Sequence, residues 1–533
     1  MIVAIQYSLI FLIISTFGKL SYSKLFKNNK SNEFFKIPVV YFYPIIGLFV
    51  IGNLTVLVNF FFPVGNIIKF IIFLVILLNS KKILKNFSFN KLNFLNIFNT
   101  LVLSLSSYDT GLAYDATLYH LNNQKWILDS KIVIGMSNLH DRFGYQSIIE
   151  YINVNFWMEN NFLYLHFVSL IFLNVLFNIL GFFILRGNNK YFLIGSTIAL
   201  YGFLDNFGFN GGKNGYFEIE AIGKQDTAFA ILVFIVCITI FQKSKDISND
   251  EFLFVSLLVI FCIQLRVTGY LLIPFLIFLL FKNKRRLNNK FVYLIFFYVL
   301  WLVKNIFTTS CLAFPIYLSC IRSLDWHNSN LITKEYAELQ EFHRSFSNYN
   351  SLEIWFKNWT DNVINQTVLL NFIITLSIII LFLIIFFKFK PNKEALGFLS
   401  FSVFLLIFWI YTGPTIRFGV GFLMVFVASL TLVFNERRVK NKMFTYAVLV
   451  CLVSNLLLLN KITNYFNFLD NPVLVIEKEA KTIEYTEEKG KYYGVFPKNG
   501  AEACWINKKC VVTKDNIINY KKYGYNFFIL EDK

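Results

Sequence analysis

Long apolar runs separated by short basic segments recur along almost the whole chain, and this pattern restricts the folds open to it. Of the 533 residues, 56% are hydrophobic and 15% are charged, whereas a soluble domain carries about 25% charged residues. A helix needs about 20 apolar residues to cross a bilayer, and several runs approach that length. The pattern therefore predicts an all-α polytopic membrane protein, whose helices satisfy their own backbone hydrogen bonds.

Fourteen segments qualify as candidate transmembrane helices. The weakest are 93–107, which contains three asparagines, and the pair 251–265 and 267–281, which Arg266 and Gly269 interrupt; full spans and half-helices both remain open for these. Basic clusters such as 81–85, 282–286 and 437–440 follow apolar segments, and with about fourteen spans they all fall on one face, which the positive-inside rule assigns to the cytoplasm. The net charge of +18 is therefore attributed to basic clusters on the cytoplasmic face, and no nucleic acid partner is expected. The candidate segments are 2–18, 37–62, 66–80, 93–107, 161–186, 190–204, 226–242, 251–265, 267–281, 291–307, 366–388, 395–411, 417–434 and 443–460.

In this topology both chain ends and the longer polar segments lie outside the cytoplasm. Strand-like stretches at 492–496, 510–512 and 527–530 predict a small α/β cap in the C-terminal region. Cys504 and Cys510 lie in the same region with five residues between them, and a disulfide and two free thiols remain equally open. The expected units are transmembrane helices in 1–106, an outer loop at 107–160, a helix bundle at 161–460 with outer loops at 205–225 and 308–365, and an outer C-terminal region at 461–533.

The outer loop at 107–160 contains a first cluster of candidate functional residues. Asp115 and Tyr119 are four residues apart and would share one face of a helix, with His120 beside them. Asp115 could act as a general base toward a hydroxyl group. Alternatively, Asp115 caps a short interfacial helix while Tyr119 belongs to an aromatic belt. The two interpretations have equal weight on these residues alone.

A second cluster in the same loop consists of His140, Asp141 and Arg142. An arginine can clamp a phosphate or a carboxylate with two parallel hydrogen bonds. The alternative is a local ion pair between Asp141 and Arg142, which contributes little in water. Because two such clusters occur within one loop, a functional role is favoured.

Two arginines beside or within apolar segments complete the set. Arg417 belongs to the tight turn at 411–419 and should lie at the outer membrane boundary, where it either binds a lipid phosphate or marks a helix end by snorkelling. Arg266 interrupts a long apolar stretch, and a charge there is costly enough to be a functional candidate. The loop at 205–225 is rich in glycine and acidic residues but offers no His or Cys partner, so neither a metal nor another cofactor is expected.

The layout resembles the GT-C superfamily of polytopic glycosyltransferases, which have many spans, a large outer loop with an aspartate after a helix, further outer loops and an outer C-terminal domain. The segments 138–144, 304–305 and 413–419 also resemble bacterial multi-pass proteins that are grouped with surface-polysaccharide synthesis. The resemblance covers most of the chain in layout and is specific at a few residues.

The resemblance implies that a sugar moves from a polyprenyl-phosphate donor to a glycan, lipid or protein acceptor at the outer face of a bacterial cytoplasmic membrane. Asp115 would be the general base, and the departing phosphate would meet Arg417 or Arg266. Superfamily members often have paired acidic residues at this point, whereas Asp115 has no acidic neighbour, so Asp109 and Asp141 are substitutes. The full candidate set is Asp115, His120 and Asp141 as catalytic residues, with Tyr119, His140, Arg142, Arg266 and Arg417 as substrate-binding residues.

Two other functions fit the same pattern less directly. A polysaccharide polymerase or ligase would need the same base and arginines, so the sequence does not separate it from a transferase. A flippase or transporter of lipid-linked glycans should carry charged or helix-breaking positions in two corresponding halves, whereas only Arg266 is expected to lie deep in the membrane. The chain has no P-loop motif, so ATP-driven transport lacks support, and an enzyme is favoured.

Overall fold

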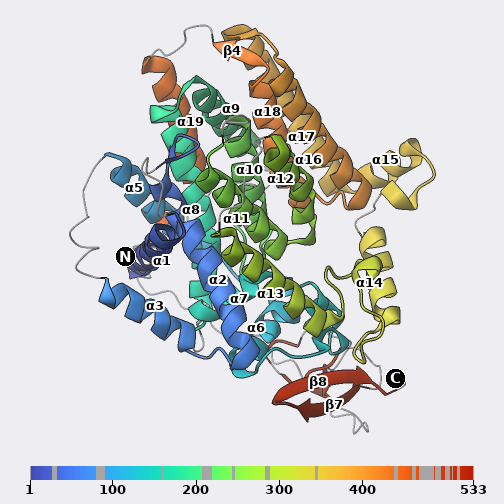
Figure 1. The fold of residues 1–533 in the computed structure, drawn as a ribbon. Coiled ribbons are helices and arrows are strands. Elements are labelled where there is room, and N and C mark those ends of the chain that lie inside the picture. Colours follow the sequence, from blue (N-terminus) through green and yellow to red (C-terminus); the bar gives the residue numbers. More distant parts are fainter. Residues whose placement is uncertain are drawn as a thin grey trace.

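The computed structural model of the chain is mostly helical, and Figure 1 shows long helices packed side by side with only short strands. Apolar helices that are buried on every side, such as α8 (Leu163–Arg186), form the centre of the bundle, as expected of helices without a polar face. The predicted helical class is therefore confirmed. The structure describes residues 2–26, 33–79, 91–158, 161–206, 219–242, 247–282, 289–342, 346–436, 442–458, 464–466, 485–486, 494–497, 504–506, 508–512 and 517–531.

The first two helices cross closely because glycines face each other where they meet. A Cβ atom on Gly18 would collide with the backbone oxygen of Tyr43, and one on Gly47 would collide with that of Ile14. Small residues at such contacts let helix backbones approach within a membrane. This region comprises α1 (Ile2–Leu25), β1 (Glu33–Phe34), β2 (Ile37–Pro38), η1 (Val39–Phe42), α2 (Tyr43–Phe61), α3 (Ile67–Leu78) and α5 (Lys91–Leu105).

Asparagines of α5 pair with α8 inside the bundle. Asn99 Nδ2 donates to Asn178 Oδ1 at 2.9 Å, Asn178 Nδ2 donates to Asn96 Oδ1 at 2.9 Å, and Asn174 Nδ2 donates to Thr100 Oγ1 at 2.7 Å. Buried amides are tolerated when they are hydrogen-bonded to each other. The segment with three asparagines therefore forms a helix within the bundle despite its polar side chains.

The loop expected at 107–160 is a compact layer of short helices that closes one end of the bundle. Many of its residues are buried, including Leu121, Phe143 and Ile148. It comprises η2 (Ser106–Asp109), the π-helical turn η3 (Ala116–His120), α6 (Leu121–Asp129), η4 (Met136–Asn138), η5 (Asp141–Gly144), α7 (Ile148–Asn153) and η6 (Val154–Phe156).

The middle of the chain forms a helical segment that is broken at Arg266. After α11, the Arg266 backbone is extended (φ −150°, ψ 144°), so the candidate spans 251–265 and 267–281 are separate helices with a kink between them. The elements here are α8, α9 (Asn189–Asn206), α10 (Asp226–Gln242), α11 (Asn249–Leu265), η7 (Val267–Leu272), α12 (Ile273–Lys282) and α13 (Phe291–Thr309).

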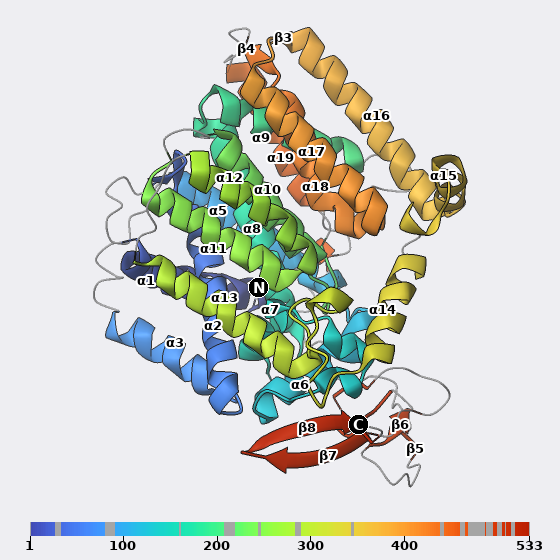
Figure 2. The same cartoon turned by 45° about the vertical axis from the view of Figure 1, so that its right-hand side comes forward.

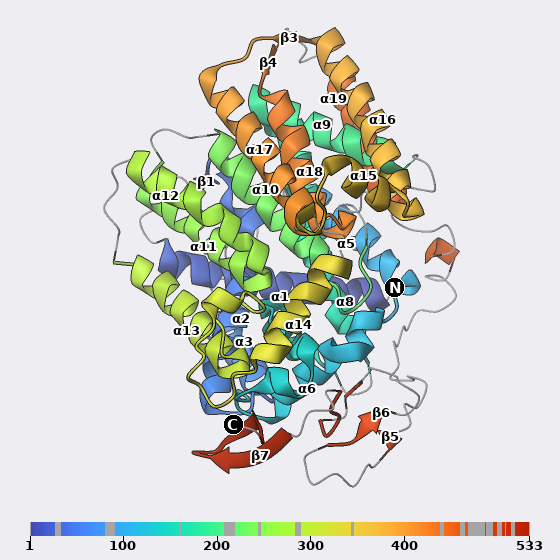
Figure 3. The same ribbon diagram turned by 90° about the vertical axis from the view of Figure 1, so that its right-hand side faces the viewer.

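The remaining helices begin with α14, which crosses the front of the molecule in Figure 3 between α18 above and α6 below. The expected outer loop at 308–365 thus contains two helices of its own, α14 and α15. The elements are η8 (Tyr317–Ser319), α14 (Ser329–Phe342), η9 (Phe346–Asn348), α15 (Leu352–Thr360), α16 (Val363–Phe386), β3 (Phe387–Phe389), α17 (Lys393–Thr412), α18 (Ile416–Thr431), β4 (Phe434–Glu436) and α19 (Lys442–Leu458).

Within the described residues, six helices are long and apolar enough to cross a membrane, and five apolar helices are shorter. Exposed large apolar side chains lie along α3, α13, α16 and α17, as expected of surfaces that contact lipid. The chain is therefore a membrane protein. The number of long helices falls short of fourteen because several apolar segments form shorter helices, such as α3 with 12 residues and α18 with 16. The long helices are Ile2–Leu25, Val39–Phe61, Leu163–Arg186, Phe291–Thr309, Val363–Phe386 and Lys393–Thr412.

The C-terminal region packs on the layer formed by 107–160. Strands β7 (Ile517–Lys522) and β8 (Tyr525–Leu530) form an antiparallel hairpin, and Phe528 N donates to Ile134 O at 3.0 Å. Figure 2 shows this hairpin next to α6, at the opposite end of the molecule from β3 and β4. The short pair β5 (Tyr485–Thr486) and β6 (Phe496–Pro497) lies nearby along the chain.

The strand predictions for this region are partly right. The stretch 527–530 lies within β8, and the stretches 492–496 and 510–512 meet at the Val495–Cys510 bridge. The strand at 517–522 was missed because its lysines and asparagine obscure the alternation. The described residues of this region form strand pairs, so the expected α/β cap is supported in its β part.

Two disulfides join cysteines of the polar segments. Cys504 is bonded to Cys510, and Cys311 is bonded to Cys320. The three cysteines in apolar helices, Cys237, Cys262 and Cys451, are free. The open question at Cys504 and Cys510 is thereby resolved in favour of a disulfide, while the pairing of Cys311 with Cys320 was not anticipated.

Candidate functional site

A cavity of about 1060 Å³ lies where the 107–160 layer meets α10, η7, α14 and α18. Its wall combines apolar and aromatic side chains, such as Phe314, Phe408 and Phe418, with a few charged ones. Ligand cavities typically combine apolar walls with a few precisely placed polar groups. This cavity is therefore the candidate functional site.

Four charged residues from three parts of the chain form an alternating cluster at the cavity wall. Arg417 lies between two carboxylates, with Nη1 3.7 Å from Asp115 Oδ2 and Nε 3.8 Å from Asp226 Oδ2. Arg266 forms an ion pair with the other oxygen of Asp226. All four side chains line the same cavity, so two guanidinium groups and two carboxylates are held within contact distance of one another.

Local structure explains how these side chains reach one place. Asp226 opens α10, where the helix dipole favours a negative charge. Arg266 lies at the break between α11 and η7, and its guanidinium lies 4.1 Å from the centre of the Phe418 ring. Arg417 is in the first turn of α18, after a turn that two indole groups hold in place: Trp359 Nε1 donates to Pro414 O at 2.9 Å, and Trp409 Nε1 donates to Thr415 O at 3.0 Å.

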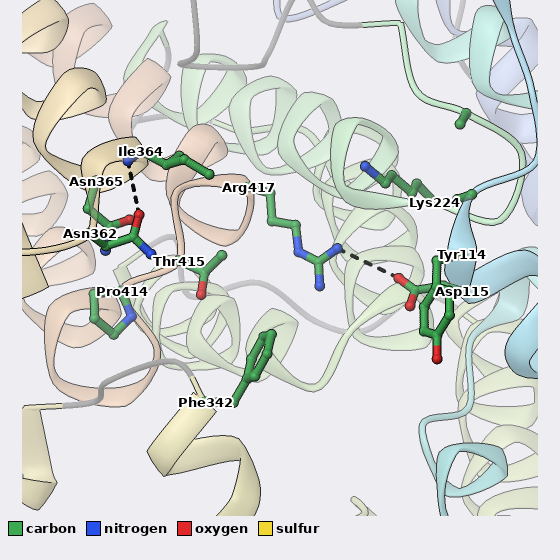
Figure 4. A pocket seen from close by; sticks show the side chains of 12 residues that line it. Tyr114, Asp115, Lys224, Phe342, Asn362, Ile364, Asn365, Pro414, Thr415 and Arg417 are labelled. Carbon is green, nitrogen blue, oxygen red and sulfur yellow. Dashed lines mark hydrogen bonds and ion pairs between the residues drawn. The ribbon is translucent and has the colours of Figure 1, made fainter. Parts of the chain in front are cut away.

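A smaller cavity of about 790 Å³ adjoins the first one. Tyr114, Asp115, Lys224, Phe342 and Arg417 line both cavities. Figure 4 shows Arg417 extended toward Asp115, with Lys224 on the same side of the hollow as Asp115. The Asp115–Arg417 ion pair therefore stands at the junction of two spaces.

His120 lines the large cavity and is supported from behind by a carboxylate. His120 Nδ1 contacts Glu150 Oε1, and Gln124 Nε2 donates to Glu150 Oε2 at 2.7 Å. Glu150 is 2% exposed. The ring of Tyr119 lies against His120, with the ring centres 4.0 Å apart. This arrangement fixes the orientation of the imidazole ring.

A buried lysine supports another part of the cavity wall. Lys304 is fully buried in α13, and its Nζ donates to Gln146 Oε1 at 2.7 Å and lies 3.8 Å from the centre of the Trp301 ring. Gln146 and Trp301 both line the cavity. Lys304 thus joins a transmembrane helix to the loop that carries the candidate residues.

The second cluster of the loop lies beside the cavity and holds α14 in place. Glu335 of α14 is buried, accepts a hydrogen bond of 2.7 Å from Tyr145 Oη, and has Arg142 Nη1 at 3.4 Å. His140 Nδ1 lies 2.6 Å from Asp141 Oδ1. Arg142 and Tyr145 line the cavity, whereas His140 and Asp141 do not. Because α14 also contributes to the cavity wall, these contacts fix one side of the site.

The two carboxyl groups of this cluster have opposite pKa shifts. Burial, and then the negative charge of Asp141, raise the pKa of Glu335 to about 7. Burial opposes ionisation of Asp141 as well, but the hydrogen bond and charge of His140 outweigh it and hold the pKa of Asp141 well below its ordinary value. Of two neighbouring carboxyl groups, one therefore keeps a proton near neutral pH.

The raised pKa of Glu335 predicts a stability that declines as the pH rises. Its stabilising contribution is complete below the ordinary value of 4.5 and is lost as the pH rises through about 7. The expected loss between pH 6 and 8 is on the order of 1 kcal/mol, and the remainder falls between pH 4.5 and 6. This loss of stability is measured by the melting temperatures of the wild type and of Glu335→Gln in detergent. The wild type should melt at a lower temperature at pH 8 than at pH 6, while the variant should change less, and parallel curves would contradict the assignment.

The cavity unites most of the residues that the sequence singled out. Asp115, Tyr119, His120, Arg142, Arg266 and Arg417 all line it, whereas His140 and Asp141 lie beside it and Asp109 is exposed on η2. Sequence reasoning missed Glu150 and Glu335 entirely. Asp226, which directly follows the loop at 205–225, was not among the candidates, although an acidic residue at the start of an otherwise apolar helix was a usable signal.

No group of three potential metal-ligating His, Cys, Asp or Glu side chains occurs among the described residues. Most of the loop at 205–225, in which a metal had been considered, lies outside them. The site as described is thus an arginine–carboxylate cluster with an adjoining histidine.

Residues 1–424 match the model of a family described as a domain of unknown function (DUF8201). The chain belongs to this family. The DUF8201 match covers every residue that lines either cavity, including Asp115 and Arg417, and ends before the C-terminal hairpin. No curated protein and no solved structure matches the chain.

Proposed function

We propose that this DUF8201 protein is a GT-C-like membrane glycosyltransferase that moves a sugar from a polyprenyl-phosphate donor to an acceptor in cell-surface glycan synthesis. The observation that carries the proposal is the shared cavity of Asp115, Arg266 and Arg417. Sugar transfer from a lipid phosphate requires cations where the phosphate departs and a base where the acceptor hydroxyl attacks. The large cavity is lined by both kinds of group, the guanidinium groups of Arg266 and Arg417 and the carboxylate of Asp115.

The cavity wall suits a lipid-phosphate donor in its chemistry. Arg266 and Arg417 offer guanidinium groups that can bind a phosphate through paired hydrogen bonds. The apolar residues beside them, such as Val267 and Phe418, belong to helices of the membrane region. An isoprenoid chain can therefore remain among apolar side chains while its phosphate meets the arginines.

The ion pairs of Arg417 support a site that rearranges when donor binds. Its distances of 3.7 and 3.8 Å to Asp115 and Asp226 exceed the 2.7–2.9 Å of a strong charged hydrogen bond. A phosphate can thus take over Arg417 without breaking a tight pair. Asp115 then serves either as the base or by holding Arg417 in place, and both uses require its negative charge.

The proposed setting is the cytoplasmic membrane of a bacterium, with about fourteen spans and the cavity on the outer side. Two disulfides, Cys311–Cys320 and Cys504–Cys510, support this orientation because disulfides persist outside the reducing cytoplasm. The hairpin β7–β8 and the 107–160 layer lie together, and β3, which contains Lys388, lies at the other end. Basic residues on the inner face agree with the positive-inside rule.

A polymerase or ligase is the second candidate, and one observation favours it. The two cavities join at Asp115 and Arg417, which leaves room for a long glycan beside the donor. Parallel assays with a short and a long acceptor separate the two functions. A flippase or transporter is supported less, because the deep Arg266 is tied to Asp226 in an ion pair.

The test is transfer of a labelled sugar from polyprenyl-phosphate donors by purified protein in proteoliposomes. Asp115→Asn should lower the transfer rate by about 10²-fold or more, because the substitution removes the charge beside Arg417. The matched control Asp325→Asn, an exposed residue of the 308–365 segment, should keep the wild-type rate. Wild-type protein that transfers sugar from no lipid-phosphate donor would refute the proposed function.

A further inference from the structure

We propose that His120, oriented by Glu150, is the base that removes the proton from the acceptor hydroxyl. This inference rests on the proposed sugar transfer and names a catalytic residue other than the aspartate that the GT-C resemblance implies. In this assignment His120 is a catalytic residue, Glu150 is a positioning residue, and Asp115 holds Arg417.

The contact with Glu150 selects the useful form of the imidazole ring. A carboxylate beside Nδ1 accepts a hydrogen bond from the Nδ1–H group. The neutral ring then carries its proton on Nδ1 and its lone pair on Nε2. Gln124 Nε2 donates to the second oxygen of Glu150 at 2.7 Å, which prevents the carboxylate from turning away. His120 lines the cavity, so a base that is held at one nitrogen can receive a proton at the other.

The other acid–base candidates are less free to act. Asp115 is paired with Arg417, and Asp226 is paired with both Arg266 and Arg417. The Nε2 atoms of His140 and His166 are enclosed by protein and have no hydrogen-bond partner in the described structure, and neither residue lines the cavity. Among the histidines that the structure describes, His120 is thus the one that lines the cavity and also contacts a carboxylate.

The local backbone gives His120 an unusual position. Residues Ala116–His120 form a π-helical turn, in which Leu121 N donates to Ala116 O. π-helical turns are rare and frequently occur at functional sites. The turn lies between Asp115, which contacts Arg417, and α6, which carries Gln124. It therefore places Asp115 and His120 on the wall of the same cavity.

The proposed step moves one proton and exchanges one bond. The acceptor oxygen forms a bond to the anomeric carbon of the donor sugar while its proton passes to His120 Nε2. The bond between that carbon and the phosphate oxygen breaks, and its electron pair leaves with the lipid phosphate beside Arg417 and Arg266. Glu150 stabilises the imidazolium that results.

The step predicts a characteristic pH dependence, because only the neutral ring can accept the proton. The titratable groups around His120 are Tyr119 against the ring, Glu150 from α7 and Lys304 from α13. Those on the cavity wall are Asp115, Arg142, Lys224, Asp226, Arg266, Glu338, Glu341 and Arg417. Transfer by the wild type should rise with pH, at most about tenfold per unit, and then level off. The pKa of Glu335 is raised to about 7, so the profile must also be recorded in Glu335→Gln.

The experiment measures kcat/KM from pH 5 to 9 for the wild type, His120→Gln, Glu150→Gln, Glu150→Asp and Asp115→Asn. His120→Gln should lose at least about 10²-fold at the plateau together with the rising limb. Glu150→Gln should shift the limb to lower pH, because the imidazolium loses its counter-charge, and Glu150→Asp should restore it. Asp115→Asn should lower the whole curve and keep the limb.

A chemical readout separates this inference from the proposed function. Diethyl pyrocarbonate modifies neutral imidazole, and mass spectrometry of the His120 peptide gives the extent of modification at each pH. Glu150→Gln should extend the modification to lower pH, whereas Glu335→Gln should not.

A rising limb that survives in His120→Gln, or is lost in Asp115→Asn, would overturn the assignment while leaving sugar transfer intact. Identical modification profiles for the wild type and Glu150→Gln would refute the pairing even without any transfer activity.

Discussion

Arg417→Ala is expected to lower kcat/KM for sugar transfer by about 10²–10³-fold. Arg417 lies at the junction of the two cavities and between Asp115 and Asp226. A guanidinium there is placed to stabilise the negative charge that develops on the departing phosphate. Such stabilisation is worth most when the donor groups are already in place before the reaction. Initial rates with a labelled polyprenyl-phosphate donor in proteoliposomes measure the effect.

Two further variants make the Arg417 result specific. Arg417→Lys keeps the positive charge but loses the planar fork of donors, so its rate should lie between those of the wild type and Arg417→Ala. Arg322 is an exposed arginine in the loop after the Cys311–Cys320 disulfide, and it does not line the cavity. Arg322→Ala should therefore leave the rate unchanged. A wild-type rate in Arg417→Ala would remove this residue from the phosphate site.

Arg266→Ala is expected to destabilise the folded protein by about 3–5 kcal/mol, the cost of leaving one member of a buried ion pair without its partner. The Asp226 side chain is 8% exposed and that of Arg266 is 18% exposed. Arg417 remains 3.8 Å from Asp226, but at this distance it replaces only part of the lost interaction. Thermal denaturation of the purified protein in detergent measures the change.

A double-variant cycle isolates the pair itself. Arg266→Met combined with Asp226→Asn should recover much of the lost stability, because neither side chain is then a buried charge without a partner. Lys334→Ala is the matched control, since its ion pair with Glu338 at 3.5 Å is exposed and such pairs contribute little. If Arg266→Ala and Lys334→Ala lower the melting temperature equally, the pair has no special role in stability.

Local patterns in the sequence predicted many of the helices of this protein and several residues of its cavity. Apolar runs predicted the helices. The expected outer position of Asp115 and Arg417, and the charge of Arg266 within an apolar stretch, selected three residues that share a cavity. The reason is that burial in lipid acts on each segment separately, so composition alone signals it. The strand at 527–530 was also readable from its run of aromatic and branched apolar residues.

Pairings between distant segments were not readable. Glu150 lies 30 residues from His120, and Glu335 lies 190 residues from Tyr145. The sequence around an isolated acidic residue does not indicate which distant residue it will contact in the folded protein. The same applies to Asp226, whose role depends on a break in one helix at Arg266 and the start of another helix at Arg417.

The sequence by itself determined that the chain is a helical membrane protein with ionisable groups concentrated in a few polar segments. Free energies of transfer between water and lipid depend on each segment's own side chains, so they can be read along the chain. Only the tertiary structure decided which charges neutralise one another, which histidine receives a carboxylate, and which residues face the cavity. Those outcomes depend on distances of a few ångströms between segments far apart in sequence, and packing of the whole bundle sets such distances.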